Sequence, residues 1–303
     1  MLLLIPRGGK SRAMVVKVAS TDAAATAVRR EQMVLRSVQG LELGEVRPTV
    51  PRIVGEAWSG RPALLLSGLP GTPMSSLYHR WRHTARPDRV AADFAAVGDW
   101  LAAFQKATAG QRRPLEMDAG VCSAIRLRFE GEPGLDGDLA RLEGLFGWLR
   151  IHTTPQSAVH GDLWCGNVLV DHGRVLGVVD WELGTFRGEP VRDLVRFPLT
   201  YALYLDRHTA PGHLVAGHPG LRAGRWGAGI EYAAFGEGWF PALFRRFLQA
   251  GLERLGAPTR LWADVLLAGL AEVAANADHQ GFAHQHWELF RRLSARRGPT
   301  SWQ

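Results

Sequence analysis

The chain has 303 residues, of which 46% are hydrophobic and 21% are charged, a composition that indicates an ordinary globular protein of one or two domains. Its two cysteines argue against a disulfide framework, and no apolar run reaches the roughly 20 residues that span a bilayer, so we expect a cytoplasmic protein without a membrane partner. The net charge of +7 could attract nucleic acid, but the arginines are scattered along the chain, so no nucleic-acid partner is expected.

The first 67 residues are predicted to be rich in strands and to contain one helix. Apolar runs at residues 1–5, 13–18 and 64–66 are typical of strands, and residues 23–38 have a helical pattern. The apolar start is too short for a signal peptide and ends at Pro6. Residues 8–11, with the sequence GGKS, are predicted to form a hairpin turn. They are not a phosphate-binding P-loop, because Leu4 stands where that motif requires its first glycine.

A segment rich in glycine and proline at residues 68–73 separates this part from a region in which helices dominate. Helices are predicted at residues 88–108, 136–150, 192–206, 231–255, 259–278 and 284–297. Pro198 is expected to kink or interrupt the third of these helices, and Pro241 to interrupt the fourth. Residues 209–229 are predicted to form a loop or lid.

Four polar residues near the C-terminus could suggest a metal site. They are Asp278, His279, His284 and His286. Their spacing matches no standard zinc pattern, so a polar junction between helices is the preferred interpretation.

The most informative segment is residues 158–170, AVHGDLWCGNVLV, followed by VVDWE at residues 178–182. It fits the catalytic-loop pattern H-R-D-L-x-x-x-N of protein kinases, with Gly161 in place of the arginine. His160, Asp162 and Asn167 occupy the pattern's fixed positions, and Asp180 takes the place of the later aspartate that holds magnesium. The alternative is a purely structural role, in which the first segment is a turn and Asp180 ends a strand.

The chemistry of phosphoryl transfer explains these residue types. The enzyme must position groups and neutralise charge, and a carboxylate such as Asp162 can accept the proton of the acceptor hydroxyl. Magnesium prefers hard oxygen ligands, which Asn167 and Asp180 can supply. Residues 168–170 and 175–179 are predicted to be two strands joined by a hairpin turn, which would bring Asn167 and Asp180 side by side. Glu182 could add a metal contact or touch the acceptor.

These residues resemble the aminoglycoside phosphotransferase and choline kinase-like family, which uses His-Gly-Asp where protein kinases have His-Arg-Asp. The stretch at residues 188–194, GEPVRDL, is similar to the family's G-D-P-x-x-D-L stretch. The resemblance implies that Asp193 anchors the catalytic loop, although a plain acid in the first turn of a helix is an equal alternative. His160 is counted with Asp162 among the catalytic residues and is interpreted as a scaffold of the loop rather than a proton carrier. Cys165, inside the loop, is interpreted as a small filler residue, with a reactive thiol as the alternative.

The resemblance extends to the N-terminal part, where it implies the ATP-binding residues. Lys17 would orient the nucleotide phosphates and Glu31 would pair with Lys17. For Lys17 the alternative is an edge-strand lysine that discourages aggregation, and for Glu31 it is a solvated helix face. Residues 64–71 resemble the strand and hinge beside the adenine, with Ser67 and Leu69 as the cofactor-binding residues. The acidic residue that the family often has near Ser67 is missing.

The expected fold is therefore α+β and bilobal, like that of protein kinases. The N-terminal nucleotide-binding lobe would be residues 1–67, the hinge 68–73, and the helical catalytic and acceptor-binding lobe 74–303. The N-lobe lacks a recognisable first strand and glycine loop, so it is expected to be truncated there. With them missing, ATP is expected to bind weakly, or the true start would lie upstream of Met1.

The expected function is ATP- and Mg²⁺-dependent transfer of a phosphoryl group to a hydroxyl of a small molecule, with a sugar or polyol favoured. The alternatives are a non-catalytic, nucleotide-binding pseudokinase and a choline-type or aminoglycoside kinase. For choline, a cage could be built from four aromatic residues, Trp226, Tyr232, Phe235 and Trp239.

Overall fold

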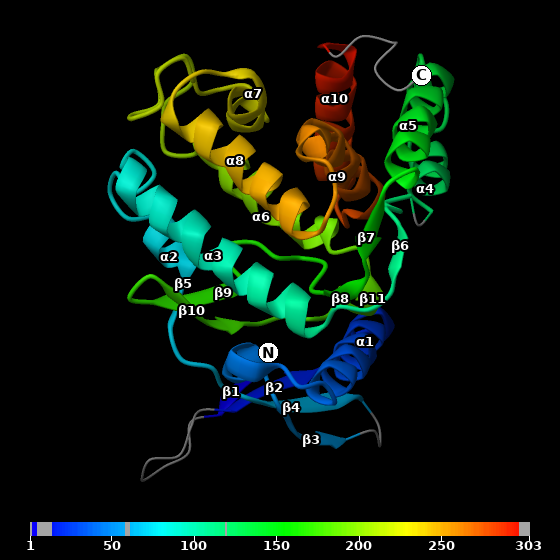
Figure 1. Ribbon diagram of the computed structural model, residues 1–303, viewed down its shortest axis with the longest axis vertical. Helices are drawn as coiled ribbons and strands as arrows, with labels where there is room; N and C mark the ends of the chain where they lie inside the picture. The colour runs from blue at the N-terminus through cyan, green and yellow to red at the C-terminus, as the bar shows by residue number, and fades with distance from the viewer. Residues whose placement is uncertain (1, 5–13, 58–60, 119, 297–303) are drawn as a thin grey trace. The chain divides into compact units, whose positions relative to one another are not determined.

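The computed structural model describes residues 2–4, 14–57, 61–118 and 120–296 (Figure 1). Contacts within the chain divide it into two compact units. Unit 1 comprises residues 1–110 and 156–193, and unit 2 comprises residues 111–155 and 194–303. The predicted hairpin turn at residues 8–11 lies outside the described residues, and the division into lobes at residues 67 and 74 stays a prediction.

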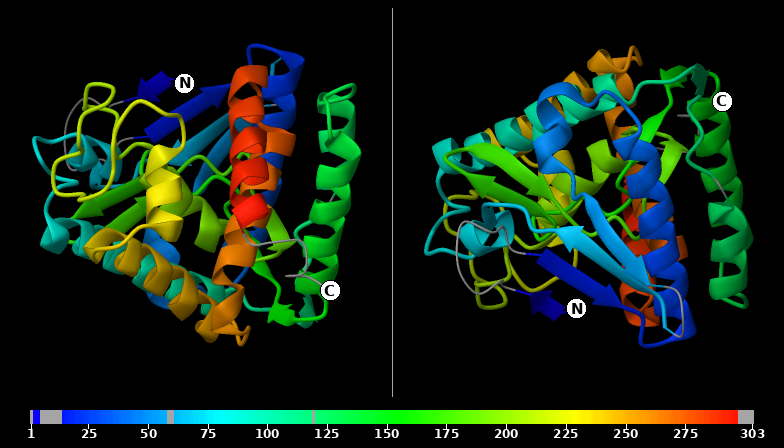
Figure 2. Two further views of the ribbon diagram at one scale, coloured as in Figure 1. Left: turned by 90° about the horizontal axis from the view of Figure 1, so that it is seen from above. Right: turned by 90° about the horizontal axis from the view of Figure 1, so that it is seen from below.

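Unit 1 contains an antiparallel sheet with the strand order β1-β2-β4-β3. Its strands are β1 (Leu2–Leu4), β2 (Met14–Val18), β3 (Ile53–Ala57) and β4 (Ala63–Ser67). Helix α1 (Asp22–Gln39) lies along this sheet and contacts β2, β3 and β4 (Figure 2). Thr21 caps the helix, because its hydroxyl accepts a hydrogen bond from the N–H of Ala24 at 3.1 Å. The short helix η1 (Gly44–Thr49) follows.

The rest of unit 1 builds the segment that holds the kinase-like motif. Its elements are β5 (Thr72–Pro73), α2 (Met74–Tyr78), α3 (Pro87–Ala107), β8 (Ser157–Val159), β9 (Val168–Asp171), β10 (Arg174–Val178) and β11 (Thr185–Gly188). The predicted hairpin is confirmed: β9 pairs with β10, and β5 pairs with the other edge of β9. His172 and Gly173 turn the chain with φ of 43° and 72°, as a two-residue hairpin turn of type I′ requires.

Unit 2 is mainly helical. It contains a small sheet of β6 (Arg112–Pro114) and β7 (Thr153–Pro155), with the helices α4 (Val121–Arg128), α5 (Leu135–Arg150), α7 (Ala228–Phe235), α8 (Trp239–Arg254), η2 (Thr259–Leu261), α9 (Trp262–Asn276) and α10 (Gln280–Arg296). Helix α9 is buried over most of its surface and contacts α4, α5, α8 and α10 (Figure 2). Helix α6 (Val191–Leu203) runs across the boundary between the units.

Two sequence expectations about helix ends are wrong. The helix expected at residues 231–255 is interrupted by the glycines at 236 and 238, not by Pro241, which lies in the first turn of α8, where its missing N–H is tolerated. The last helix begins at Gln280, four residues before the expected start. Helix α6 continues through Pro198 and ends at Leu203.

The polar residues near the C-terminus do not form a metal site in the described part of the chain, which contains no group of three or more potential ligands. His284 pairs with Glu132 at 3.2 Å, and His286 is buried against Trp226 and Phe282. Burial lowers the pKa of His286 to about 4, so this imidazole stays neutral near pH 7. Within the described residues, no helix combines the length and apolar character needed to cross a membrane.

Candidate active site

The loop between β8 and β9 has a shape that only glycine allows at its second position. Gly161 has a φ of +82°, and a Cβ atom added there would lie 2.3 Å from the carbonyl oxygen of Leu183. An arginine, as in the protein-kinase pattern, would meet both the unfavourable backbone conformation and this oxygen. The glycine of the His-Gly-Asp sequence therefore allows the backbone of Leu183 to approach the loop closely.

Asp193 holds this loop from the start of α6. Its carboxylate accepts hydrogen bonds from the N–H groups of His160 at 2.7 Å and Gly161 at 2.9 Å. The side chain is buried, and burial raises its pKa, while His160 and the two N–H groups act in the opposite direction. Asp193 thus makes the loop contacts expected of an anchor, beyond what a plain first-turn acid would make.

His160 is fully buried, and both of its ring nitrogens are engaged with backbone groups. Nδ1 accepts a hydrogen bond from the N–H of Asp162 at 3.2 Å, so the proton lies on Nε2, which donates to the carbonyl of Val179 at 2.9 Å. The ring also packs edge-on against Trp181. These bonds tie the loop to the end of β10 and leave the ring no free nitrogen for proton transfer, which supports its interpretation as a scaffold.

Asp162 and Asn167 lie together in the same loop. The amide Nδ2 of Asn167 donates to the backbone carbonyl of Asp162 at 3.0 Å and to its carboxylate at 3.3 Å. The backbone carbonyl of Asn167 accepts from the N–H of Val179 at 2.9 Å, which places Asn167 beside the residue that precedes Asp180. The hairpin therefore brings the loop and Asp180 together, as the sequence indicates.

Lys17 on β2 forms ion pairs with two acids, Glu31 on α1 and Asp180 after β10. Its ammonium lies 2.7 Å from the carboxylate of Glu31 and also bonds Asp180. Burial lowers the pKa of Lys17, but attraction to the two carboxylates outweighs it, so the pKa is raised and the lysine stays charged. Since β2 is flanked by β1 and β4, the interpretation of Lys17 as an edge-strand lysine is wrong.

Glu31 is fully buried, so the alternative of a solvated helix face is also wrong. One carboxylate oxygen faces Lys17, and the other accepts a hydrogen bond from the N–H of Trp181 at 3.1 Å. A buried carboxylate needs such partners, because desolvation of an unpaired charge is costly. Glu31 therefore fixes both the lysine and the segment that carries Asp180.

Asp180 and Glu182 follow β10 on a tight path. Asp180 has a φ of +71°, a left-handed conformation that few residues other than glycine adopt. Partial burial and the nearby negative charge of Asp180 raise the pKa of Glu182. A cation bound near these two carboxylates would be attracted to both.

The donor set suits magnesium rather than zinc. Nδ2 of Asn167 is occupied, and in the part of the chain that the structure describes its Oδ1 has no hydrogen-bond partner, so this oxygen can serve as a ligand. Asp180 supplies a carboxylate. Magnesium requires only one or two protein carboxylates beside phosphate oxygens and water, so the lack of a larger ligand cluster among the described residues fits it.

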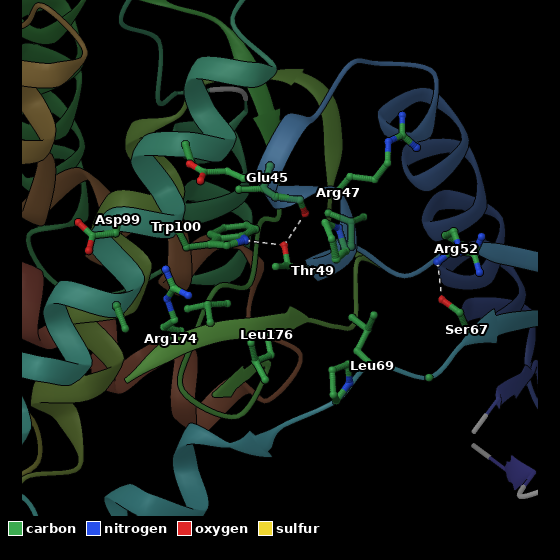
Figure 3. A pocket seen from close by; sticks show the side chains of 18 of the residues that line it. Glu45, Arg47, Thr49, Arg52, Ser67, Leu69, Asp99, Trp100, Arg174 and Leu176 are labelled. Carbon is green, nitrogen blue, oxygen red and sulfur yellow. Dashed lines mark hydrogen bonds between the residues drawn. The ribbon is translucent and has the colours of Figure 1, made fainter. Parts of the chain in front are cut away.

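Ser67 and Leu69 are placed differently from the other predicted residues. The Ser67 hydroxyl accepts a hydrogen bond from the N–H of Arg52, and the Leu69 side chain lies so close to Gly177 that an added Cβ would be 2.9 Å away. Both side chains line a cavity that Lys17 does not line (Figure 3). Their role in binding a nucleotide therefore stays a prediction.

Sequence reasoning missed several residues that shape the site. Val15 shares the face of β2 with Lys17, and Leu64 lies directly opposite Lys17 on β4, so these two residues are neighbours of the lysine in the sheet. Trp181 is fully buried, its indole N–H donates to the carbonyl of Val178, and its ring contacts Phe104. The strand alternation could have revealed Val15. The position of Trp181 between two acids gave no comparable signal.

Cys165 behaves as a filler residue. It is buried, and burial raises the pKa of its thiol to about 12, so the reactive thiolate is not populated near neutral pH. Its backbone carbonyl accepts a hydrogen bond from the N–H of Ser75 at 2.8 Å, which joins the loop to α2.

We expect Gly161→Ala to destabilise the protein well beyond the cost of its backbone conformation. A positive φ costs an alanine roughly 1–2 kcal/mol, and overpacking against Leu183 adds roughly 1–3 kcal/mol. Gly173→Ala is the matched control, because Gly173 also has a positive φ, +72°, but an added Cβ meets nothing within 4 Å. Urea unfolding of both variants measures the difference, and equal losses would show that the contact with Leu183 does not constrain the loop.

Comparisons with known proteins agree with this geometry. The model of the phosphotransferase enzyme family, APH, matches residues 7–226. Among solved structures, the chain is similar to a thermostable mutant of aminoglycoside phosphotransferase APH(4)-Ia in its apo form, with 14% identity, 97% of this chain and 90% of that chain covered, and a TM-score of 0.59. The ternary complex of a thermostable mutant with ADP and hygromycin B gives 14% identity, 96% and 88% coverage and a TM-score of 0.57. No curated protein sequence matches the chain.

The chain belongs to the phosphotransferase enzyme family. The structural likeness confirms the expected kinase-like fold, with a small strand-rich N-terminal part and a larger helical part.

Proposed function

We propose that this protein transfers the γ-phosphoryl group of ATP to a hydroxyl group of a small molecule, most favourably a sugar or polyol. The observation that carries the proposal is the linked set Glu31–Lys17–Asp180 beside the Asp162–Asn167 pair, all within unit 1. ADP in the complex of a structurally similar phosphotransferase supports ATP as the donor.

Each residue has a definite task in this proposal. Lys17 binds phosphate oxygens, and Glu31 holds the ammonium in place. Asp162 accepts the proton of the acceptor hydroxyl and is positioned by Asn167. Mg²⁺, held by Asn167 and Asp180 with Glu182 nearby, would neutralise charge on the transferred phosphoryl group. His160 and Asp193 keep the loop rigid, which matters because catalysis here depends on positioning.

The choice of acceptor rests on the acids of unit 2. An aminoglycoside carries several ammonium groups and needs a cluster of carboxylates, whereas the acids of this region are dispersed along the sequence. Two of them are also paired with arginines: Glu231 with Arg225 and Arg296, and Glu288 with Arg291. Hygromycin B in the similar structure keeps an aminoglycoside as the alternative.

The four rings proposed as a choline cage divide into separate groups. Tyr232 and Trp239 contact His218, Trp226 contacts His286, and Phe235 lies against Arg296. The rings thus serve packing.

A non-catalytic pseudokinase is the alternative from another class of protein. The intact set of Asp162, Asn167 and Asp180 argues against it.

A single assay tests both the activity and the acceptor. Purified protein with ATP and Mg²⁺ is offered kanamycin-type aminoglycosides, hygromycin B, choline and a panel of neutral sugars and polyols, and ADP release is measured. We expect Mg²⁺-dependent turnover that is fastest with a neutral hydroxyl compound. Efficient transfer to an aminoglycoside alone would contradict the choice of acceptor, and ATP binding without turnover on any acceptor would favour the pseudokinase.

A further inference from the structure

A cavity of about 1100 Å³ lies beside the linker between β4 and β5, within unit 1 (Figure 3). Four segments form its walls: residues 45–50 and 52 at η1, residues 67–70 of the linker, one face of α3, and residues 173–176 of the β9–β10 hairpin. The residues of the proposed catalytic set, from Lys17 to Asp180, do not line it. A molecule in this cavity would therefore not contact Lys17, Asp162 or Asp180.

Part of the cavity wall is formed by apolar side chains. The indole N–H of Trp100 donates to the hydroxyl of Thr49 at 2.8 Å, and that hydroxyl donates to the carbonyl of Val46 at 2.7 Å. With these polar atoms already paired, Trp100, which is 4% exposed and stacks on Phe104, presents the exposed part of its ring, and Leu69 and Leu176 face the same space (Figure 3). This surface favours an apolar body over a sugar.

Three arginines border the cavity, and they differ in whether their guanidinium groups already have partners. Arg47 is committed, because its guanidinium donates to the carbonyls of Gln39 and Leu41 at 3.1 and 2.6 Å. Within the described ranges, the guanidinium groups of Arg52 and Arg174 have no hydrogen-bond or ion-pair partner. Arg174 lies on the Trp100 side of the cavity, whereas Arg52 lies at the opposite end beside Ser67 (Figure 3).

Two acids, Glu45 and Asp99, also border the cavity. In Figure 3 both acids lie at the Trp100 end of the cavity, away from Leu69 and Leu176. Arg174 is the positive group at this end of the cavity, and in the described part of the chain its guanidinium is unpaired, so it can bind an anion. A guanidinium is well suited to this, since its planar fork matches carboxylate, sulfonate and phosphate groups.

We propose that this cavity is a second ligand site, which binds a small amphipathic anion with its apolar body against Trp100, Leu69 and Leu176 and its oxyanion on Arg174. Such a ligand would contact the linker at Leu69 directly. The proposal does not depend on the phosphoryl transfer described above.

The test uses two fluorescent probes with the same rings. 1-Anilinonaphthalene-8-sulfonate carries the anion, and N-phenyl-1-naphthylamine lacks it. Each is titrated into the full-length protein without nucleotide. We expect saturable binding of both, and we expect Arg174→Gln to weaken the sulfonate probe by about tenfold, as the loss of a charge-assisted hydrogen bond implies, while the neutral probe is unaffected. Arg52→Gln is the matched control, because it removes the same charge from the opposite end of the cavity, and it should change neither affinity by more than about twofold.

A second pair of variants tests the location. Ala103→Phe places a ring in the cavity from α3 and should abolish binding of both probes, whereas Ala102→Phe, on the same helix but outside the lining, should not. Equal effects of Arg174→Gln and Arg52→Gln, or unchanged binding in a folded Ala103→Phe variant, would overturn the proposal. If near-ultraviolet circular dichroism shows that Ala103→Phe does not fold, the comparison of the two arginine variants with both probes tests the proposal. Arg52 and Arg174 are exposed, so their substitution should not disturb folding.

Discussion

Asp162→Asn is expected to lower kcat by about 10²–10⁴-fold, the range that general-base assistance contributes. The substitution keeps the size of the side chain and the backbone carbonyl that accepts from Asn167. It removes the carboxylate that takes the proton of the acceptor hydroxyl. Because the base acts on the acceptor, the affinity for ATP should stay within about twofold.

Steady-state kinetics and calorimetric titration of ATP measure the two quantities separately. Asp171→Asn is the matched control, since Asp171 is an exposed acid at the end of β9, and its loss should leave kcat unchanged. If Asp162→Asn turns over within a few fold of the unaltered protein, Asp162 is not the base, although phosphoryl transfer itself would still stand.

The parts of the site that the sequence predicts are those set by local rules. The hairpin of β9 and β10 follows from two apolar runs around a turn that contains glycine, and its register then places Asn167 beside Val179. Asp162 and Asp180 could be predicted as well, because they stand at fixed distances in the sequence from the two strands of this hairpin. Local signals of this kind survive folding because the turn itself fixes which residues meet.

Other features depend on contacts between segments far apart in the chain. Glu31 could have been a solvated acid, and only the fold shows that it is buried between Lys17 and Trp181. The need for glycine at position 161 comes from Leu183, which no local pattern connects to it. The side chains of Ser67 and Leu69 point into a cavity built from four segments, which no periodicity could reveal.

Asp180→Asn is expected to have the largest effect on Mg²⁺-dependent turnover and an opposite effect on nucleotide binding without metal. Loss of the metal-binding carboxylate removes several kcal/mol of charge stabilisation in the transition state, so kcat/KM for MgATP should fall by about 10³-fold or more. Asparagine is chosen because it tolerates the left-handed backbone at this position better than alanine.

The opposite effect follows from Lys17, whose ammonium bonds both Asp180 and Glu31. Without the Asp180 charge, Lys17 keeps one carboxylate partner, and a negative charge near the nucleotide phosphates is gone. ADP measured in the presence of EDTA should therefore bind at least as tightly to Asp180→Asn as to the unaltered protein. His172→Asn, at the other described non-glycine position with a positive φ in this hairpin region, controls for the backbone conformation and should leave both quantities unchanged. A general loss of folding would weaken nucleotide binding both with and without metal. Loss of the metal ligand alone would lower Mg²⁺-dependent turnover and leave metal-free ADP binding intact. Full activity of Asp180→Asn at ordinary Mg²⁺ concentrations would contradict the proposed phosphoryl transfer itself.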